Sequence, residues 1–193
     1  MKEKKSIFNL PNSLSFFRIG CIPLLMVLLF FPHKTTSFLA ALTFGLASIS
    51  DLLDGFVARR RQLVTTFGKF LDPLADKLIV SAALIMLIPL DRVPAWMVVV
   101  IIGRELAIMG LRSVAISEGK VITADHLGKQ KMVFQTVAIL GLLLHFEYYG
   151  VNFHVVGMFF LWMAVIITLW SGFNYFRNFW DVLEENEPTT EGN

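Results

Sequence analysis

The chain has 193 residues, of which 55% are hydrophobic, and its mean hydropathy is +0.66. A soluble domain of this length cannot bury so much apolar surface, so the composition excludes an ordinary soluble protein and predicts a membrane protein. The formal net charge of +2 is too small to favour a nucleic-acid partner.

Apolar stretches of roughly 20 residues, the length that crosses a bilayer, follow one another along the chain. They lie near 14–31, 38–58, 73–90, 94–117, 132–149 and 155–176. We therefore expect an all-α, polytopic membrane protein with six transmembrane helices. It should form a single domain over residues 1–183, followed by a disordered acidic tail over 184–193.

The basic residues gather at alternate ends of these stretches, mostly on the side of the two termini. Because positively charged loops stay on the cytoplasmic side, both termini are expected there. The basic start followed by an apolar run also resembles a signal peptide. No small-residue cleavage site follows Phe31, so we expect the first span to be retained.

Two further segments are expected at the membrane surface. Residues 5–13 have too few apolar side chains to cross and predict a short interfacial helix, with Asn12 or Ser13 capping the first span. Segment 173–185 interleaves aromatic and charged residues, which fits either an interfacial helix or a simple extension of the last span.

Two pairs of carboxylates carry the strongest chemical signal. Asp51 and Asp54 share a helix face at i, i+3, and so do Asp72 and Asp76 at i, i+4. The first pair ends one span and the second begins the next, so a loop over 59–71 would let them converge. Asp72 stands before a proline, a pattern that predicts a helix cap.

Four carboxylates this close repel one another unless a cation binds between them. Oxygen ligands without nearby Cys or His select Mg²⁺ or Mn²⁺, or Ca²⁺ at a looser site. A site for two such ions suits phosphoryl chemistry, because it stabilises charge on the attacking and leaving oxygens together. Ion pairs between the aspartates and arginines 59–61 or Lys77 are the purely structural alternative.

Small residues follow the first carboxylate pair. Gly55 and Ala58 leave its helix face bare, so a phosphate-bearing group could approach the backbone; close packing of helices is the alternative explanation. Arg59 stands where a guanidinium could bind a phosphate with two hydrogen bonds. The segment therefore predicts binding of a phosphorylated ligand beside the metal site.

The pattern D-x2-D-G-x2-A-R-x8-G-x3-D-x3-D, which starts at Asp51 and ends at Asp76, resembles the CDP-alcohol phosphatidyltransferase family. The resemblance implies a six-helix membrane fold, usually homodimeric, that moves a phosphatidyl group from CDP-diacylglycerol to an alcohol and releases CMP. It implies that the first three aspartates hold one ion, that Asp51, Asp72 and Asp76 contact the second, and that Asp76 is also the general base. The residues implied for binding CDP-diacylglycerol are Asn12, Ser15, Arg18, Gly55, Ala58, Arg59, Thr65 and Gly68.

The acceptor alcohol depends on cations elsewhere in the chain. Arg104 and Arg112 lie about two turns apart in the fourth span, and Lys129 and Lys131 precede the fifth. Together they could bind the phosphate of an acceptor, although an ion pair between Arg104 and Glu105 plus membrane anchors would also explain them.

The segments around these cations resemble the bacterial subgroup of the family that makes phosphatidylglycerophosphate, apart from Met132, where threonine is common. The resemblance implies sn-glycerol 3-phosphate as acceptor and a bacterial cytoplasmic membrane with the site facing the cytoplasm. Inositol phosphate or phosphatidylglycerol remain alternative acceptors. A divalent-cation transporter is a remote alternative, because the aspartates cluster at one membrane face and spans one, five and six carry almost no charge.

Overall fold

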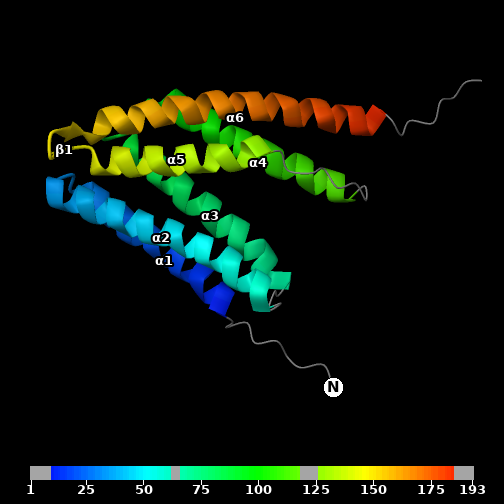
Figure 1. Ribbon diagram of the computed structural model, residues 1–193, viewed down its shortest axis with the longest axis horizontal. Helices are drawn as coiled ribbons and strands as arrows, with labels where there is room; N and C mark the ends of the chain where they lie inside the picture. Colours follow the sequence, from blue (N-terminus) through cyan, green and yellow to red (C-terminus); the bar gives the residue numbers. More distant parts are fainter. Residues whose placement is uncertain (1–9, 62–65, 118–125, 185–193) are drawn as a thin grey trace, which may run out of the picture.

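The computed structural model describes residues 10–61, 66–117 and 126–184, with side chains described over 13–50, 71, 73–116 and 130–180. These ranges form helices and one small hairpin, so the expected all-α class is confirmed (Figure 1). The helices are α1 (Leu10–Phe30), α2 (Lys34–Arg61), α3 (Thr66–Leu87), α4 (Ala95–Ser117), α5 (His126–Leu144) and α6 (Phe153–Glu184).

Consecutive helices run in alternating directions, and α3 lies between the α1–α2 pair and the group of α4, α5 and α6 (Figure 1). The start of α1 and the end of α6 point toward the same end of the molecule. Strands β1 (Glu147–Tyr148) and β2 (Val151–Asn152) form an antiparallel hairpin at the other end. We call this the hairpin end.

Several expected boundaries are wrong. Helix α1 already begins at Leu10, so Asn12 and Ser13 lie in its first turn instead of capping it, and no separate helix ends at residue 13. The rest of the expected interfacial helix, residues 1–9, lies outside the described residues. Helix α5 ends at Leu144, five residues earlier than expected, because His145 adopts a left-handed φ of 54° before the hairpin.

The two alternatives for the C-terminal segment are resolved by α6. It runs without interruption from Phe153 to Glu184, so segment 173–184 extends the last apolar helix. Most of the expected acidic tail, residues 185–193, lies outside the described part of the chain, and Glu184 is helical.

A pair of glycines holds α5 and α6 together. A Cβ atom on Gly141 would lie 2.8 Å from Cα of Gly157, and one on Gly157 would lie 2.7 Å from the backbone nitrogen of Leu142. Both distances are too short for real atoms, so only glycine allows the two backbones to approach this closely. The crossing lies beside a core of buried aliphatic side chains that all the helices share.

Arg92 is buried at the hairpin end and links α5 to α2 through hydrogen bonds. Its side chain is 3% exposed, and it donates hydrogen bonds to the carbonyl oxygens of Leu143 at 3.0 Å and Leu142 at 3.3 Å. It also donates to Oγ of Ser37 at 3.0 Å. The last turn of a helix leaves carbonyl oxygens without intrahelical partners, and Arg92 supplies the hydrogen-bond donors for two of those in α5. Burial lowers the pKa of this guanidinium below its ordinary value.

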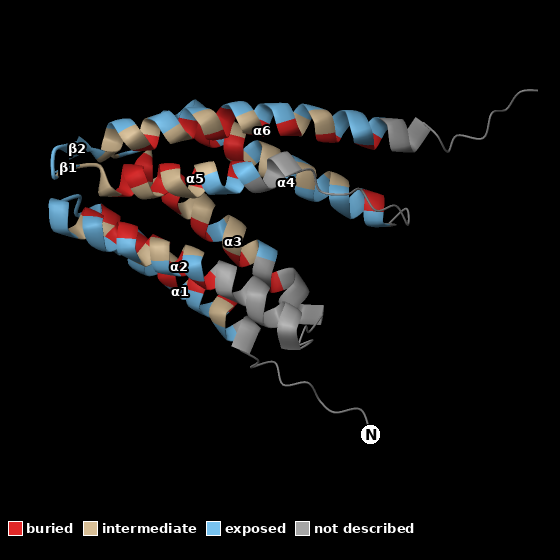
Figure 2. Cartoon of the chain, in the orientation of Figure 1, coloured by how far each residue is buried: buried red, intermediate tan, exposed pale blue. Residues whose placement is uncertain are grey.

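Each helix has a face of exposed residues (Figure 2), and many of these residues are large and hydrophobic. Large hydrophobic side chains such as Phe30, Val99, Phe159 and Trp170 are more than half exposed, whereas soluble monomers rarely expose large apolar areas. Within the described residues, Ser13–Phe30 of α1 and Phe153–Trp180 of α6 are long and apolar enough to cross a bilayer.

Candidate functional site

The four aspartates lie on α2 and α3, on either side of a short connection. Helix α2 continues to Arg61 and α3 starts at Thr66, so the expected loop over 59–71 is largely helical. Asp72 therefore lies inside α3 and does not cap it. The residue after it, Pro73, is also inside the helix. Neighbouring helices and local adjustments commonly compensate for such a proline in membrane helices.

These boundaries place the two aspartate pairs at similar distances along their helices from the α2–α3 connection. Asp51 precedes the end of α2 by ten residues and Asp76 follows the start of α3 by ten, which is about 15 Å of helix in each case. Asp54 and Asp72 are both about 10 Å from the connection by the same measure. Helices α2 and α3 also contact each other.

This donor set fits hard divalent cations. Its members are carboxylates alone, which Mg²⁺ and Mn²⁺ prefer. Among the side chains that the structure describes, no three acidic, His or Cys residues form a metal-binding group. Asp76 is the one aspartate of the four that belongs to those side chains.

The carboxylate of Asp76 is mostly buried, with 18% of its side chain exposed. Its Oδ2 accepts a hydrogen bond from Nζ of Lys77 at 3.0 Å. The same ammonium group lies 3.1 Å from Oε2 of Glu105 on α4. Lys77 thus links the last aspartate of the motif to a second polar group, between α3 and α4.

Glu105 is the centre of that second group, which we call the Glu105 cluster: Lys77, Arg104, Glu105, Lys131 and Ser171. Oε1 of Glu105 accepts hydrogen bonds from Lys131 and, at 3.3 Å, from Arg104. Lys131 is 4% exposed, so its charge depends on this partner. The cluster joins α3, α4, α5 and α6.

Helix α6 contributes the remaining polar atoms. Arg104 donates a hydrogen bond to Oγ of Ser171 at 2.7 Å, and a Cβ on Gly172 would lie 3.2 Å from Cγ of Arg104. The glycine therefore gives the arginine room to lie across α6. The hydroxyl groups of Thr168 and Tyr175 are buried and accept or donate no hydrogen bond within the described part of the chain.

The expected acceptor cations are only partly brought together. Arg104 and Lys131 meet at Glu105, which supports the ion-pair alternative and the anion-pocket interpretation equally. Arg112 is exposed on α4. Lys129 belongs to the first turn of α5, and its side chain lies outside the described ones.

Ser15 and Arg18, expected on the nucleotide side, are both buried on one face of α1, with exposures of 0% and 1%. Helix α1 packs against α2 and α3, so these polar groups face the motif helices. Gly55, Ala58 and Arg59 lie on α2, Gly68 lies on α3 and Asn12 lies on α1, without described side chains; Thr65 lies outside the described residues.

Sequence reasoning did not include Lys77 and Glu105 among the site residues and considered them only as ion-pair partners of the aspartates and of Arg104. It also missed Ser171 and Tyr175, which are 4% and 7% exposed. The available signal was the rarity of charges in apolar segments, which marks Glu105 as unusual.

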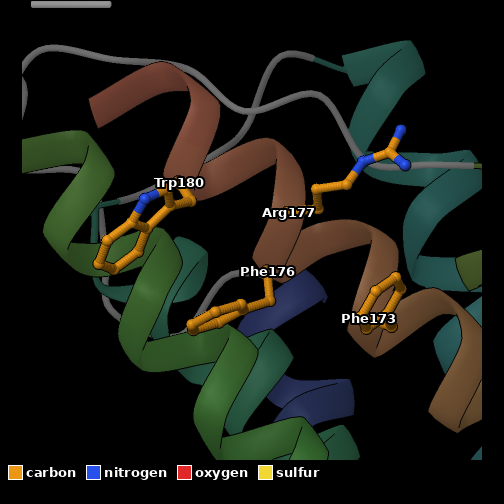
Figure 3. Close-up of a pocket in the computed structure, with 4 residues that line it drawn as sticks. All are labelled: Phe173, Phe176, Arg177 and Trp180. Carbon is orange, nitrogen blue, oxygen red and sulfur yellow. The ribbon is translucent and has the colours of Figure 1, made fainter. Parts of the chain in front are cut away.

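A groove of about 500 Å³ lies on the C-terminal part of α6 (Figure 3). It is lined by Phe173, Phe176, Arg177 and Trp180. The rings of Phe176 and Trp180 stack with centroids 6.2 Å apart. Its lining is almost entirely aromatic, so it is a surface for apolar contact and has none of the carboxylates of the motif.

The structure brings together helices that carry a carboxylate motif, and comparison with known proteins identifies the family of the chain. Residues 8–170 match the family model of CDP-alcohol phosphatidyltransferases, and the chain belongs to this family of enzymes.

Relatives with assigned names are similar over nearly their whole length. A CDP-diacylglycerol–glycerol-3-phosphate 3-phosphatidyltransferase of Bacillus subtilis (strain 168) is 44% identical, covering 92% of this chain and 98% of the relative. Proteins of the same name from Rickettsia typhi and Haemophilus influenzae are 38% and 33% identical, each covering 88% of this chain and 96% and 92% of the relative.

Proposed function

We propose that the protein transfers the phosphatidyl group of CDP-diacylglycerol to sn-glycerol 3-phosphate, giving phosphatidylglycerophosphate and CMP in phospholipid biosynthesis. The observation that carries this proposal is the link through Lys77 between Asp76 and the Glu105 cluster. The reaction needs a base and an anion site for the acceptor close together. The names of the relatives point to the same donor and acceptor.

Asp51, Asp54, Asp72 and Asp76 would hold two divalent cations, Mg²⁺ or Mn²⁺. Bound there, the cations would neutralise the pyrophosphate of the donor and the CMP that leaves. The similar distances of the two aspartate pairs from the α2–α3 connection support this assignment. The four carboxylates would also repel one another strongly without such a counter-charge.

Asp76 would act on the acceptor directly. Its carboxylate takes the proton from a hydroxyl of glycerol 3-phosphate while that oxygen forms a bond to the phosphorus bearing diacylglycerol. The bond between this phosphorus and the oxygen of CMP breaks, and CMP leaves with the electron pair. Lys77 would orient the carboxylate through its 3.0 Å hydrogen bond.

The donor and the acceptor would occupy different sides of the motif helices. We assign the cytidine diphosphate side to the residues implied by the family resemblance: Asn12, Ser15, Arg18, Gly55, Ala58, Arg59, Thr65 and Gly68. The burial of Ser15 and Arg18 toward α2 and α3 supports this assignment. We assign the acceptor phosphate to Arg104, Arg112, Lys129 and Lys131.

We further propose that all six helices span the bacterial cytoplasmic membrane as one domain over 1–183, with the site open to the cytoplasm. The apolar outer faces and the alternating helix directions support this arrangement. Charged residues such as Lys77 and Glu105 interrupt the apolar stretches of α3 and α4, and we assign these charges to the site. The family resemblance also implies a homodimer.

Purified protein supplied with CDP-diacylglycerol and a series of radiolabelled acceptors tests the proposal. We expect product with glycerol 3-phosphate, loss of activity with a chelator, and recovery with Mg²⁺ or Mn²⁺. Product with inositol phosphate or phosphatidylglycerol alone would assign another acceptor. Metal flux into proteoliposomes without CMP release would support a transporter instead.

A further inference from the structure

The Glu105 cluster contains more positive than negative charge. Lys77, Arg104 and Lys131 all contact Glu105, while Asp76 is the one other carboxylate in contact with any of them among the described side chains. The side chains of Arg104 and Glu105 are 17% and 14% exposed. Buried cations are costly unless a counter-charge lies against them, and Glu105 supplies that charge for Arg104 and Lys131.

The two carboxylate oxygens of Glu105 contact different cations. Oε1 accepts from Lys131 and Arg104, which come from α5 and α4, whereas Oε2 faces Lys77 on α3. One side of the carboxylate thus holds the two cations assigned to the acceptor phosphate. Lysine and arginine bind phosphate oxygens through the same charge-assisted hydrogen bonds that they make to this carboxylate oxygen.

We propose that Glu105 substitutes for the phosphate of the acceptor while the site is empty and is displaced when an acceptor binds. This inference deepens the proposed function and rests on it. A dianionic phosphate carries more negative charge than the carboxylate that it replaces, and it offers a third oxygen to the cations. A neutral or singly charged group lacks the extra charge needed to displace the carboxylate. Glu105 is therefore a positioning residue that makes the site selective for phosphorylated alcohols.

The buried hydroxyl groups of Thr168 and Tyr175 fit this exchange. They and Nε of Arg104 have no hydrogen-bond partner within the described residues, although buried polar groups are normally satisfied. A phosphate has more acceptor oxygens than Glu105 and could satisfy donors that the carboxylate leaves unused. The site would then be better satisfied with the acceptor bound.

The test measures anion binding to the purified protein by calorimetry, without donor. In Glu105→Gln, we expect inorganic phosphate to bind at least about fivefold more tightly, because it no longer competes with a resident carboxylate. The preference for phosphate over singly charged nitrate should fall. The matched control Glu147→Gln removes an exposed carboxylate at the hairpin end and should bind both anions as the wild type does.

Weaker phosphate binding in Glu105→Gln would overturn the inference, because it would mean that the carboxylate only holds the cations in place. Unchanged binding of both anions would overturn it too. If this variant does not fold, the infrared difference spectrum of the wild type on adding phosphate decides the question. A shifted carboxylate band that changes again in Glu105→Asp is expected, and no carboxylate change would contradict the exchange.

A different result would refute the proposed function. Absence of phosphatidylglycerophosphate with wild-type protein, donor, metal and glycerol 3-phosphate would refute the assigned reaction, whatever the anion measurements give. Normal product formation together with unchanged anion selectivity in Glu105→Gln would refute the exchange alone.

Discussion

The ammonium group of Lys77 on α3 lies 3.1 Å from Oε2 of Glu105 on α4. This ion pair connects the helix that carries the proposed base to the helix that carries the proposed acceptor arginines. Because Lys77 also contacts Asp76, a change in either polar group alters the electrostatic surroundings of the other. Substitutions at the two groups should therefore have distinguishable kinetic effects.

Asp76→Asn should lower the turnover number at least about 100-fold, since it removes both a metal ligand and the base. Binding of CDP-diacylglycerol should persist in part, because the other donor-side residues remain. Steady-state kinetics and a donor-binding assay measure the two effects.

The matched control for that variant is Asp91→Asn, the same chemical change at an exposed turn. Asp91 has a φ of 54°, a left-handed conformation that asparagine also adopts readily. Its activity should equal that of the wild type. Full activity in Asp76→Asn would remove this residue as the base.

Arg112→Ala should raise the KM for glycerol 3-phosphate about tenfold and leave the KM for CDP-diacylglycerol nearly unchanged, as expected for a lost charge-assisted hydrogen bond. Arg177→Ala is the control, because it removes another exposed arginine, one that lines the α6 groove, and it should change neither KM. An unchanged acceptor KM in Arg112→Ala would remove this arginine from the phosphate site.

Gly157→Ala should lower the thermal midpoint of the detergent-solubilised protein. The added methyl group meets backbone atoms of α5 at 2.7–2.9 Å, and backbone cannot move aside as a flexible side chain can. Gly103→Ala is the control, because a Cβ there has no neighbour within 4 Å and alanine favours a helix. Equal midpoints for the two variants would mean that the α5–α6 crossing does not limit stability.

Arg92→Met should lower the free energy of unfolding by about 2–3 kcal/mol, because it leaves two carbonyl oxygens and the hydroxyl of Ser37 without their donor. Thermal denaturation in detergent measures the loss. Lys34→Met replaces an exposed cation at the same end and should cost much less. A stability like that of the wild type in Arg92→Met would show that solvent replaces the lost hydrogen bonds.

The aromatic groove on α6 should contact lipid. In a variant that keeps Trp180 and replaces Trp96, Trp162 and Trp170 with Phe, brominated phospholipids in bilayers should quench the fluorescence strongly, as expected for a ring in the interfacial layer. The complementary variant that keeps only Trp96, at the other end of the bundle, reports a second depth. Absence of quenching at Trp180 would mean that another protein surface covers the groove.

The number and order of the helices could be predicted because apolar length alone signals them. The helix boundaries near 59–71 could not be predicted. Arg59, Arg60 and Arg61 are as compatible with a helix end as with a loop. Pro73 suggested that the next helix starts there, whereas α3 starts seven residues earlier, at Thr66. The aspartate motif could be recognised from spacing. The Glu105 cluster could not, because its members are brought together only by the packing of four helices.

Arg92 lies at the hairpin end, three residues before α4, and about 15 Å of helix separates the start of α4 from Glu105. Arg92 hydrogen-bonds to α5 and to Ser37 of α2 at this end. These hydrogen bonds and the hydrophobic core lie between the hairpin end and the polar residues around Glu105. One side chain therefore couples the positions of α2 and α5 at the hairpin end, so a change at Arg92 affects both helices together.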